Sequence, residues 1–281
     1  MIISAAKKEN KPAAISMIRD IFGNLKLISE LSKNDLKKRF ADSYFGILWA
    51  FVSPIITICV YWFVFTVGMR GGGNEVNGYP YVLWLISGLI PWFLFSDILT
   101  SGTSVLLEYA YLVKKIVFNV SILPVVKLVT ATFIHLILLL FTLLIFAGTG
   151  HFPDIYMLQI PYYIIALWCF SISCVFVTSS VVLFFRDLGQ LVNIFMQVFI
   201  WITPIMWQDA LIAESHPVLI GILRLNPMYY IVKGYRDAMI NHVWFWDNMG
   251  MTIYFWIVTV LMFILGSSIF ARLKPHFSDV L

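Results

Sequence analysis

Side chains that could catalyse a reaction are few and scattered in this 281-residue chain. An enzyme acting at a membrane needs several carboxylates, histidines or thiols in one place, either to move protons or to bind a metal ion. Asp97, Glu108 and Asp187 stand at separate points near long apolar runs, and His135 lies alone inside another run. The three cysteines also lie in apolar runs, with no ligand-type spacing. The sequence therefore predicts no catalytic residue, metal site or disulfide.

The sequence also lacks a nucleotide-binding motif. A phosphate-binding loop has the form G-x-x-x-x-G-K-[ST], whereas the glycine run at 71–73 is followed by Asn74 and Glu75. We therefore expect no cofactor in this chain. If its activity is driven by ATP, a separate polypeptide must bind the ATP and Mg²⁺.

Two polar features near the apolar runs have structural interpretations. His135 is expected to be a neutral imidazole that shares a hydrogen bond between helices, because no second titratable residue accompanies it. A role in function is the alternative for such an intramembrane group. Arg186 and Asp187 are adjacent, which predicts a charge-compensated turn.

The apolar runs contain aromatic and amide side chains that could bind a sugar. Aromatic and amide side chains bind hydroxylated ligands, and Asn193, Gln197 and Trp201 are spaced four apart, which places them on one face of a helix. The alternative is that the aromatic side chains form interface belts and the amides bridge helices. The candidates for a substrate path are Tyr61, Trp62, Phe65, Trp84, Trp92, Asn193, Gln197 and Trp201.

The elements that position these side chains must lie in lipid. Hydrophobic residues make up 60% of the chain and charged residues 12%, half of the roughly 25% that is usual in soluble proteins. A membrane-spanning helix needs about 20 apolar residues. We therefore predict an all-α integral membrane protein with six transmembrane helices, near 44–67, 81–99, 126–147, 160–185, 188–206 and 251–271.

The positive charges predict the orientation of these helices, because loops rich in Lys and Arg stay in the cytoplasm. With six spans, only Arg70, Arg224, Lys233 and Arg236 of the 19 Lys and Arg residues fall outside. Both termini are then cytoplasmic: residues 1–43 form an N-terminal segment, 44–274 the membrane domain and 275–281 a short tail. Before the first span, Lys37, Lys38 and Arg39 could bind a diphosphate head group or anchor the chain to anionic lipid.

Three segments outside the spans carry recognisable patterns. From Ile15 to Leu31, apolar residues recur at spacings of three and four, which predicts an amphipathic helix in the membrane interface or against a soluble partner. The connection from Glu108 to Leu123 mixes aromatic, aliphatic and basic residues, as a protein-docking surface does. Between spans five and six, Ala210–Leu225 and Pro227–Ile240 are too short to span, so we expect two re-entrant external half-helices. A flat external subdomain is the alternative.

Several motifs resemble type-2 ABC permeases that export polysaccharides. The segment NDLKKRFADSYFGILWAFVSPIITICVYWFVFT, from Asn34 to Thr66, is similar to the entry of their first span. In the same order follow the run from Tyr81 to Leu99, the turn Phe185–Leu188, Thr203-Pro204-Ile205 and Asn226-Pro227-Met228. Within that family, YWFVFTVGMRGGG followed by EVNGYPY resembles the teichoic acid translocation permease.

The resemblance implies the partners and a mechanism. Two copies of this chain would form a conduit in the cytoplasmic membrane of a bacterium, above two copies of a separate ABC ATPase. The substrate would be polyprenyl-diphosphate-linked teichoic acid, or alternatively O-antigen or capsular polysaccharide; no nucleic acid is involved. The segment that resembles the ATPase-coupling helix contains Glu108, Tyr109, Tyr111, Leu112, Lys114, Lys115 and Phe118.

Two other classes remain as alternatives. A membrane enzyme acting on polyprenyl-linked sugars would need a site with carboxylates or histidine. A secondary transporter would depend on an ion gradient, and ordinarily shows intramembrane carboxylates and repeated halves. The sequence shows no cluster of carboxylates and histidines that would suit the enzyme, and neither the intramembrane carboxylates nor the repeated halves of a secondary transporter.

Overall fold

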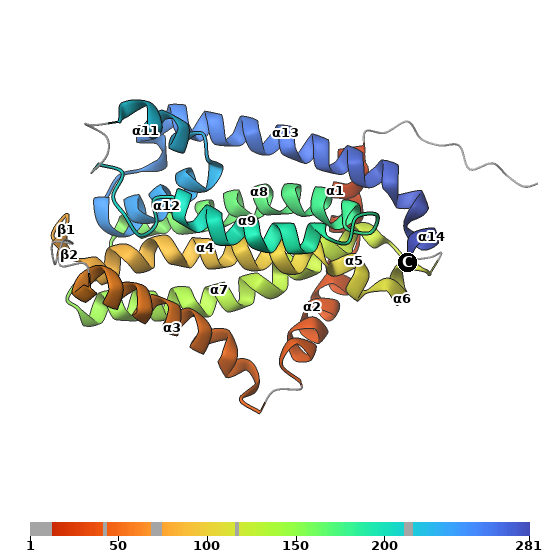
Figure 1. The fold of residues 1–281 in the computed structure, drawn as a ribbon, viewed down its shortest axis with the longest axis horizontal. Helices are drawn as coiled ribbons and strands as arrows, with labels where there is room; N and C mark the ends of the chain where they lie inside the picture. Colours follow the sequence, from red (N-terminus) through yellow and green to blue (C-terminus); the bar gives the residue numbers. More distant parts are fainter. Residues whose placement is uncertain (1–12, 42–43, 69–74, 116–117, 211–215) are drawn as a thin grey trace, which may run out of the picture.

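Helix α4 (Tyr81–Thr103) lies at the centre of a bundle of long helices (Figure 1). The structure is a computed structural model that describes residues 13–41, 44–68, 75–115, 118–210 and 216–281. Helix α4 is apolar on nearly every side, because it contacts helices all around it. The neighbours are α3 (Trp49–Trp62), α7 (Leu123–Gly148), α8 (Ile160–Val181), α9 (Leu188–Ile202) and α12 (Pro227–Arg236).

Five of the six predicted spans are long and apolar enough to cross a membrane. These helical stretches are Gly46–Gly68, Tyr81–Thr103, Val120–Gly148, Ile155–Val181 and Phe245–Val280. The first consists of the 3-10 turn Gly46–Leu48, α3 and the π-helical stretch Phe63–Gly68; the last contains α13 (Met249–Leu273). The chain is thus an all-helical, multi-pass membrane protein.

The prediction for the span at 188–206 was wrong in its length. Helix α9 ends at Ile202, because the following Pro204 cannot supply the backbone N–H that would continue the helix. Its 15 residues extend about 22 Å, which is less than the roughly 30 Å of bilayer hydrocarbon.

The predicted amphipathic helix is two helices rather than one. Helix α1 (Ala13–Gly23) ends at a glycine, and α2 (Leu25–Phe40) then runs well beyond the predicted end at Leu31. Ile28 packs against Ile122 and Val126 near the start of α7, whereas Phe22 and Leu25 are exposed. The amphipathic pattern therefore has a protein-facing side as well as an exposed apolar side.

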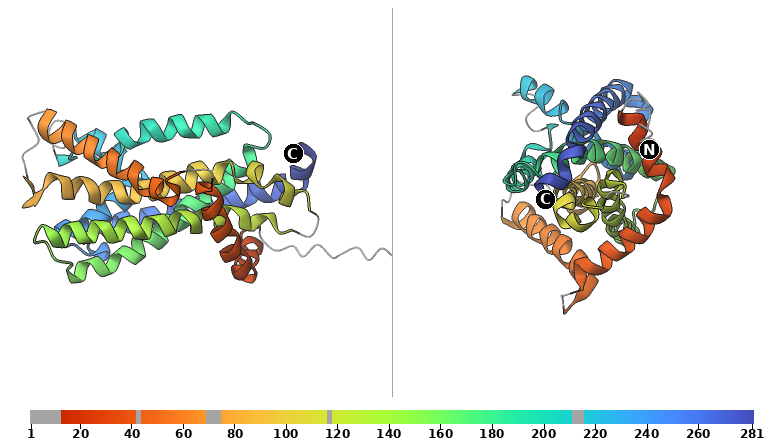
Figure 2. Two further views of the ribbon diagram at one scale, coloured as in Figure 1. Left: turned by 90° about the horizontal axis from the view of Figure 1, so that it is seen from below. Right: turned by 90° about the vertical axis from the view of Figure 1, so that its right-hand side faces the viewer.

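The connecting segments gather at the two ends of the bundle (Figures 1 and 2). One end carries α5 (Val105–Glu108), α6 (Ala110–Val113), the 3-10 turns Val120–Ile122 and Lys274–His276, and α14 (Phe277–Val280). The other end carries strands β1 (Glu75–Val76) and β2 (Tyr79–Pro80), α11 (Pro217–Arg224) and the π-helical stretch Asp237–Asn241. It also carries the 3-10 turns Ile155–Gln159 and Phe245–Asn248.

The strands pair in antiparallel fashion around Asn77 and Gly78, both with positive φ, as a tight hairpin turn requires. The expected external half-helices correspond to α11 and α12, which are both too short to span. Part of the first predicted segment, residues 211–215, lies outside the described residues, as does the glycine run at 71–73.

Helices α8 and α13 form an extensive helix–helix contact in which small residues allow close approach. At Gly266 of α13, a Cβ atom would lie 2.6 Å from the backbone oxygen of Ser173 on α8. Because the obstructing atom belongs to a helix backbone, rotation of a side chain cannot relieve the clash.

We expect Gly266→Ala to separate α8 from α13 and to lower the free energy of unfolding by about 1–3 kcal/mol, the usual cost of overpacking. The matched control is Gly250→Ala in the same helix, where no atom lies within 4 Å of the added Cβ. Thermal unfolding in detergent measures both variants. Equal midpoints for the two would contradict the close packing.

Candidate functional site

A groove of about 650 Å³ lies between α3, α4 and α9, and hydroxyl, amide and aromatic side chains line it. It brings together five of the predicted path residues, namely Tyr61, Trp92, Asn193, Gln197 and Trp201. The ring of Tyr61 meets that of Trp201 edge-on at 6.2 Å, so α3 and α9 touch across the groove. Such a lining offers hydrogen bonds and ring faces without fixed charge.

The other three predicted residues lie outside this groove. Trp62 is exposed on α3, and Phe65 packs against Trp201 with ring centroids 6.5 Å apart. Trp84 is buried beneath the guanidinium of Arg236. Only the residues on one side of each helix therefore line the groove. The sequence could not show which side of α3 and α4 this is.

Sequence reasoning missed three groups in the groove. Ser96 and Thr100 on α4 and Gln190 on α9 line it. The spacing could have identified Ser96 and Thr100, because they follow Trp92 at intervals of four, just as Gln197 and Trp201 follow Asn193. Small hydroxyls also bond their own helix, as Thr100 does to the oxygen of Ser96 at 2.7 Å, which makes them easy to overlook.

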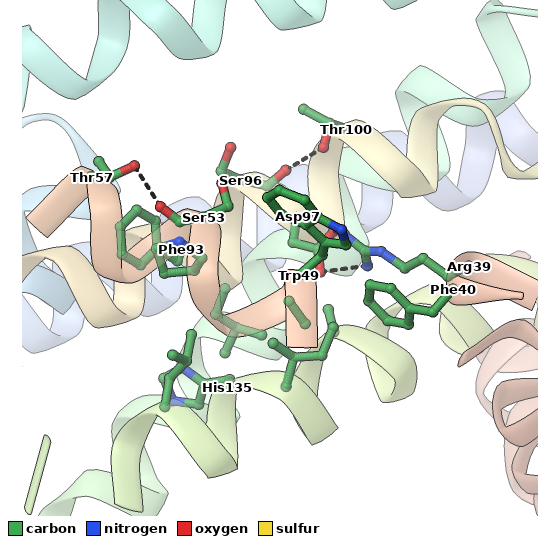
Figure 3. A pocket seen from close by; sticks show the side chains of 16 residues that line it. Arg39, Phe40, Trp49, Ser53, Thr57, Phe93, Ser96, Asp97, Thr100 and His135 are labelled. Carbon is green, nitrogen blue, oxygen red and sulfur yellow. Dashed lines mark hydrogen bonds and ion pairs between the residues drawn. The ribbon is translucent and has the colours of Figure 1, made fainter. Parts of the chain in front are cut away.

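A second cavity, of about 330 Å³, shares Ser96 and Thr100 with the groove, and Figure 3 shows the side chains that line it. Its walls are mainly apolar and come from α2, α3, α4 and α7. Arg39, one of the lining residues, donates two hydrogen bonds to Asp97, at 2.9 and 2.8 Å. Burial lowers the pKa of Arg39, but the hydrogen bonds and charge of Asp97 outweigh it, so the net shift is upward.

The three head-group candidates therefore differ in their surroundings. Arg39 ties α2 to α4 through Asp97. The ammonium of Lys38 lies 5.8 Å and 5.9 Å from the ring centroids of Tyr109 and Tyr111, within cation–π range. Lys37 is exposed. Any anion that binds Arg39 must compete with the carboxylate of Asp97.

The predicted coupling segment divides into an exposed part and a buried part. Tyr111, Lys114 and Lys115 are exposed, so they can meet a partner protein, whereas Leu112 and Phe118 are partly buried against apolar neighbours. Tyr109 is buried and donates to Asp35 at 2.8 Å. Burial raises the pKa of Tyr109, and the hydrogen bond to Asp35 raises it further, so the phenol stays protonated as a donor.

An ion cluster with two buried members and the exposed Glu108 joins this segment to the neighbouring helices. The ammonium of Lys127 on α7 lies 2.6 Å from Asp35 on α2 and 2.7 Å from Glu108 on α5. Lys127 and Asp35 are almost fully buried, at 8% and 3% side-chain exposure. Removing one partner from such a pair leaves a buried charge uncompensated, which is costly. The cluster therefore holds α2, the coupling segment and α7 together.

The structure also shows where His135 and the Arg186–Asp187 pair lie. His135 Nε2 lies 3.0 Å from the hydroxyl of Tyr235 on α12, so the expected hydrogen bond between helices is present. Arg186 and Asp187 are exposed in the turn between α8 and α9. Within the described residues, no three His, Cys, Asp or Glu side chains come together as a possible metal site.

A multi-pass helical protein with a polar, weakly charged groove between its helices has the features of a membrane permease. Residues 26–240 match the family described as ABC-2 type transporter. The chain therefore belongs to the ABC-2 transporter family, whose permeases work with ABC ATPase subunits.

Two curated relatives extend this assignment. The chain is 28% identical over 259 residues to the "O-antigen export system permease protein RfbA" of Klebsiella pneumoniae, covering 91% of this chain and 95% of the relative. It is 25% identical over 228 residues to the protein of the same name from Myxococcus xanthus, covering 81% and 85%. The resemblance to the polysaccharide-export permeases is thus supported at the level of the family, whereas the narrower resemblance to the teichoic acid permease is not.

We expect Lys127→Met to destabilise the fold by about 3–5 kcal/mol, because Asp35 stays buried with its charge uncompensated. Lys114→Met, at an exposed position of the same segment, is the matched control. Thermal unfolding in detergent gives the comparison, and the double variant Lys127→Met, Asp35→Asn should recover part of the loss. If Lys127→Met were as stable as the control, the cluster would not hold these elements together.

Proposed function

We propose that this chain is the permease subunit of an ABC exporter that moves a lipid-linked polysaccharide of the O-antigen type across the cytoplasmic membrane of a bacterium. The observation that carries the proposal is the groove between α3, α4 and α9, in a chain similar to O-antigen export permeases over most of its length. The sequence favoured teichoic acid, with O-antigen or capsular polysaccharide as the alternative. The relatives support the O-antigen alternative better.

The chemistry of the groove suits a hydrated sugar chain. Each polar group stripped of water in lipid and left unpaired costs several kcal/mol, so a polymer needs hydrogen-bonding walls along its whole path. Asn193, Gln197, Ser96 and Thr100 provide such walls. Without a fixed charge among its lining residues, the groove also avoids trapping the polymer by strong local binding.

The proposed assembly has two copies of this chain and two ABC ATPase subunits that bind ATP and Mg²⁺. In this arrangement α9 is the fifth of six crossings despite its short length, both termini are cytoplasmic, and α11 and α12 are re-entrant. The exposed residues Tyr111, Lys114 and Lys115 dock on the ATPase, and the buried cluster around Lys127 passes the movement to α2 and α7. The lipid-diphosphate head binds near Lys37, Lys38 and Arg39, where Arg39 already holds one anionic partner.

ATP hydrolysis by the complete complex tests the proposal. The chain is purified in lipid nanodiscs with a co-expressed ABC ATPase, and the double variant Tyr111→Ala, Leu112→Ala is compared with Phe152→Ala, an exposed change near the opposite end of the bundle. We expect the double variant to lose most of the hydrolysis, because Tyr111 belongs to the docking surface, and Phe152→Ala to keep it.

The substrate is tested in the same preparation. Lipid-linked O-antigen should stimulate hydrolysis, and lipid-linked teichoic acid should do so less. Stimulation by teichoic acid alone would reverse the choice between the two polymers. Failure to associate with any ABC ATPase would reject the function and favour a membrane enzyme.

A further inference from the structure

Arg236 on α12 is a buried cation that the proposed transport path does not use. Its residue exposure is 7%, yet within the described residues no carboxylate forms an ion pair with it. Its partners are instead two backbone carbonyls: Nη1 donates to Pro204 and Nη2 to Ile205, both at 2.6 Å. A cation that is buried without a carboxylate partner is costly, which makes Arg236 a functional candidate.

Helix α4 provides a slot shaped for this guanidinium. The central carbon of Arg236 lies 3.5 Å from the ring centroid of Trp84, which is close cation–π stacking. One turn further along α4, a Cβ at Gly88 would lie 2.8 Å from Nη2. The guanidinium therefore fits because residue 88 has no side chain. Trp92, another turn along, lines the groove, so slot and groove follow each other along α4.

The carbonyls that Arg236 binds belong to the segment that ends α9. They lie three and four residues beyond Trp201, the last groove residue of α9. Two more polar contacts hold the same segment: Tyr81 donates to the oxygen of Met206 at 2.5 Å, and Asn226 to the hydroxyl of Thr203 at 2.9 Å.

The rest of α9 is held less firmly. Only Val192, Met196 and Ile200 of its 15 residues are buried. Most of the length of α9 therefore presents exposed side chains, and the polar contacts described above hold the end that carries the partners of Arg236. The two bonds from a charged donor are stronger than neutral ones, which makes Arg236 the chief contact at that end.

A conduit that admits a hydrated sugar chain would also pass small ions when idle, so it needs a seal that can open. We propose that Arg236 is a positioning residue that fastens the external end of α9 to α4 and thereby closes the external end of the groove between transport events. The inference rests on the proposed function. Arg236, Trp84 and Pro204 also line a cavity of about 250 Å³, through which the polar groups of a polymer can reach the guanidinium and compete for its hydrogen bonds.

Passive leakage from proteoliposomes tests the inference, using the complete complex without ATP and an entrapped small anionic dye. In Arg236→Lys, a single ammonium replaces the planar group that binds both carbonyls. In Gly88→Ala, the added methyl displaces the guanidinium. We expect each to raise the leak about tenfold, as the loss of a hydrogen bond from a charged donor would. Gly221→Ala, with no atom within 4 Å of its Cβ, should stay tight.

Folding and assembly are checked by co-elution of the chain with its ATPase. If Arg236→Lys and Gly88→Ala assemble and leak no more than Gly221→Ala, the inference is overturned. Should either variant fail to assemble, Trp84→Phe keeps a ring in the slot with a weaker cation–π contact, and a leak no greater than that of Gly221→Ala would overturn the inference equally. Because dye leakage needs neither ATP nor polymer, its outcome is separate from the hydrolysis that tests the transport function.

Discussion

The enclosure of α4 by its neighbours is the constraint that organises this bundle. In an apolar 18-residue stretch of α4, 78% of residues are buried, whereas in the corresponding stretch of Gly46–Gly68, which contains α3, none is. An enclosed helix can present polar side chains only toward a protein cavity or a wet groove, because lipid cannot satisfy them. Ser96 and Thr100 accordingly face the groove and the neighbouring cavity, while Asp97 is held by Arg39. The groove thus follows from how α3 and α9 cover α4 without filling the space between them.

Buried charge is compensated differently at the two ends of the bundle. At the coupling end, Asp35, Lys127 and Glu108 compensate one another across three elements. At the opposite end, Arg236 is compensated by carbonyls freed where α9 stops, and by an aromatic face. The first arrangement joins three elements through opposite charges. The second holds the end of α9 through hydrogen bonds from a charged donor and a cation–π contact.

The sequence predicted the helical membrane class and the five long spans, because runs of about 20 apolar residues have few other solutions in lipid. It also grouped Asn193, Gln197 and Trp201 correctly on one face of α9. It could not show that Tyr61 and Trp92 join them while Trp84 does not, because that depends on how the helices rotate against each other. The break between α1 and α2, and the early end of α9, arise at Asn24 and Pro204. Nor could sequence reveal the partners of Lys127 and Arg236, which are distant along the chain.

Site-specific photo-crosslinking in cells that synthesise lipid-linked O-antigen is the most direct test of the central claim, that the polymer passes along the α3–α4–α9 groove. A photoreactive residue is placed at Gln197, inside the groove, and in a separate chain at Leu140, an exposed position on α7 outside it. We expect polysaccharide adducts at position 197 that depend on ATP, and none at position 140. Equal labelling at both positions, or no polysaccharide at position 197 during active export, would contradict it.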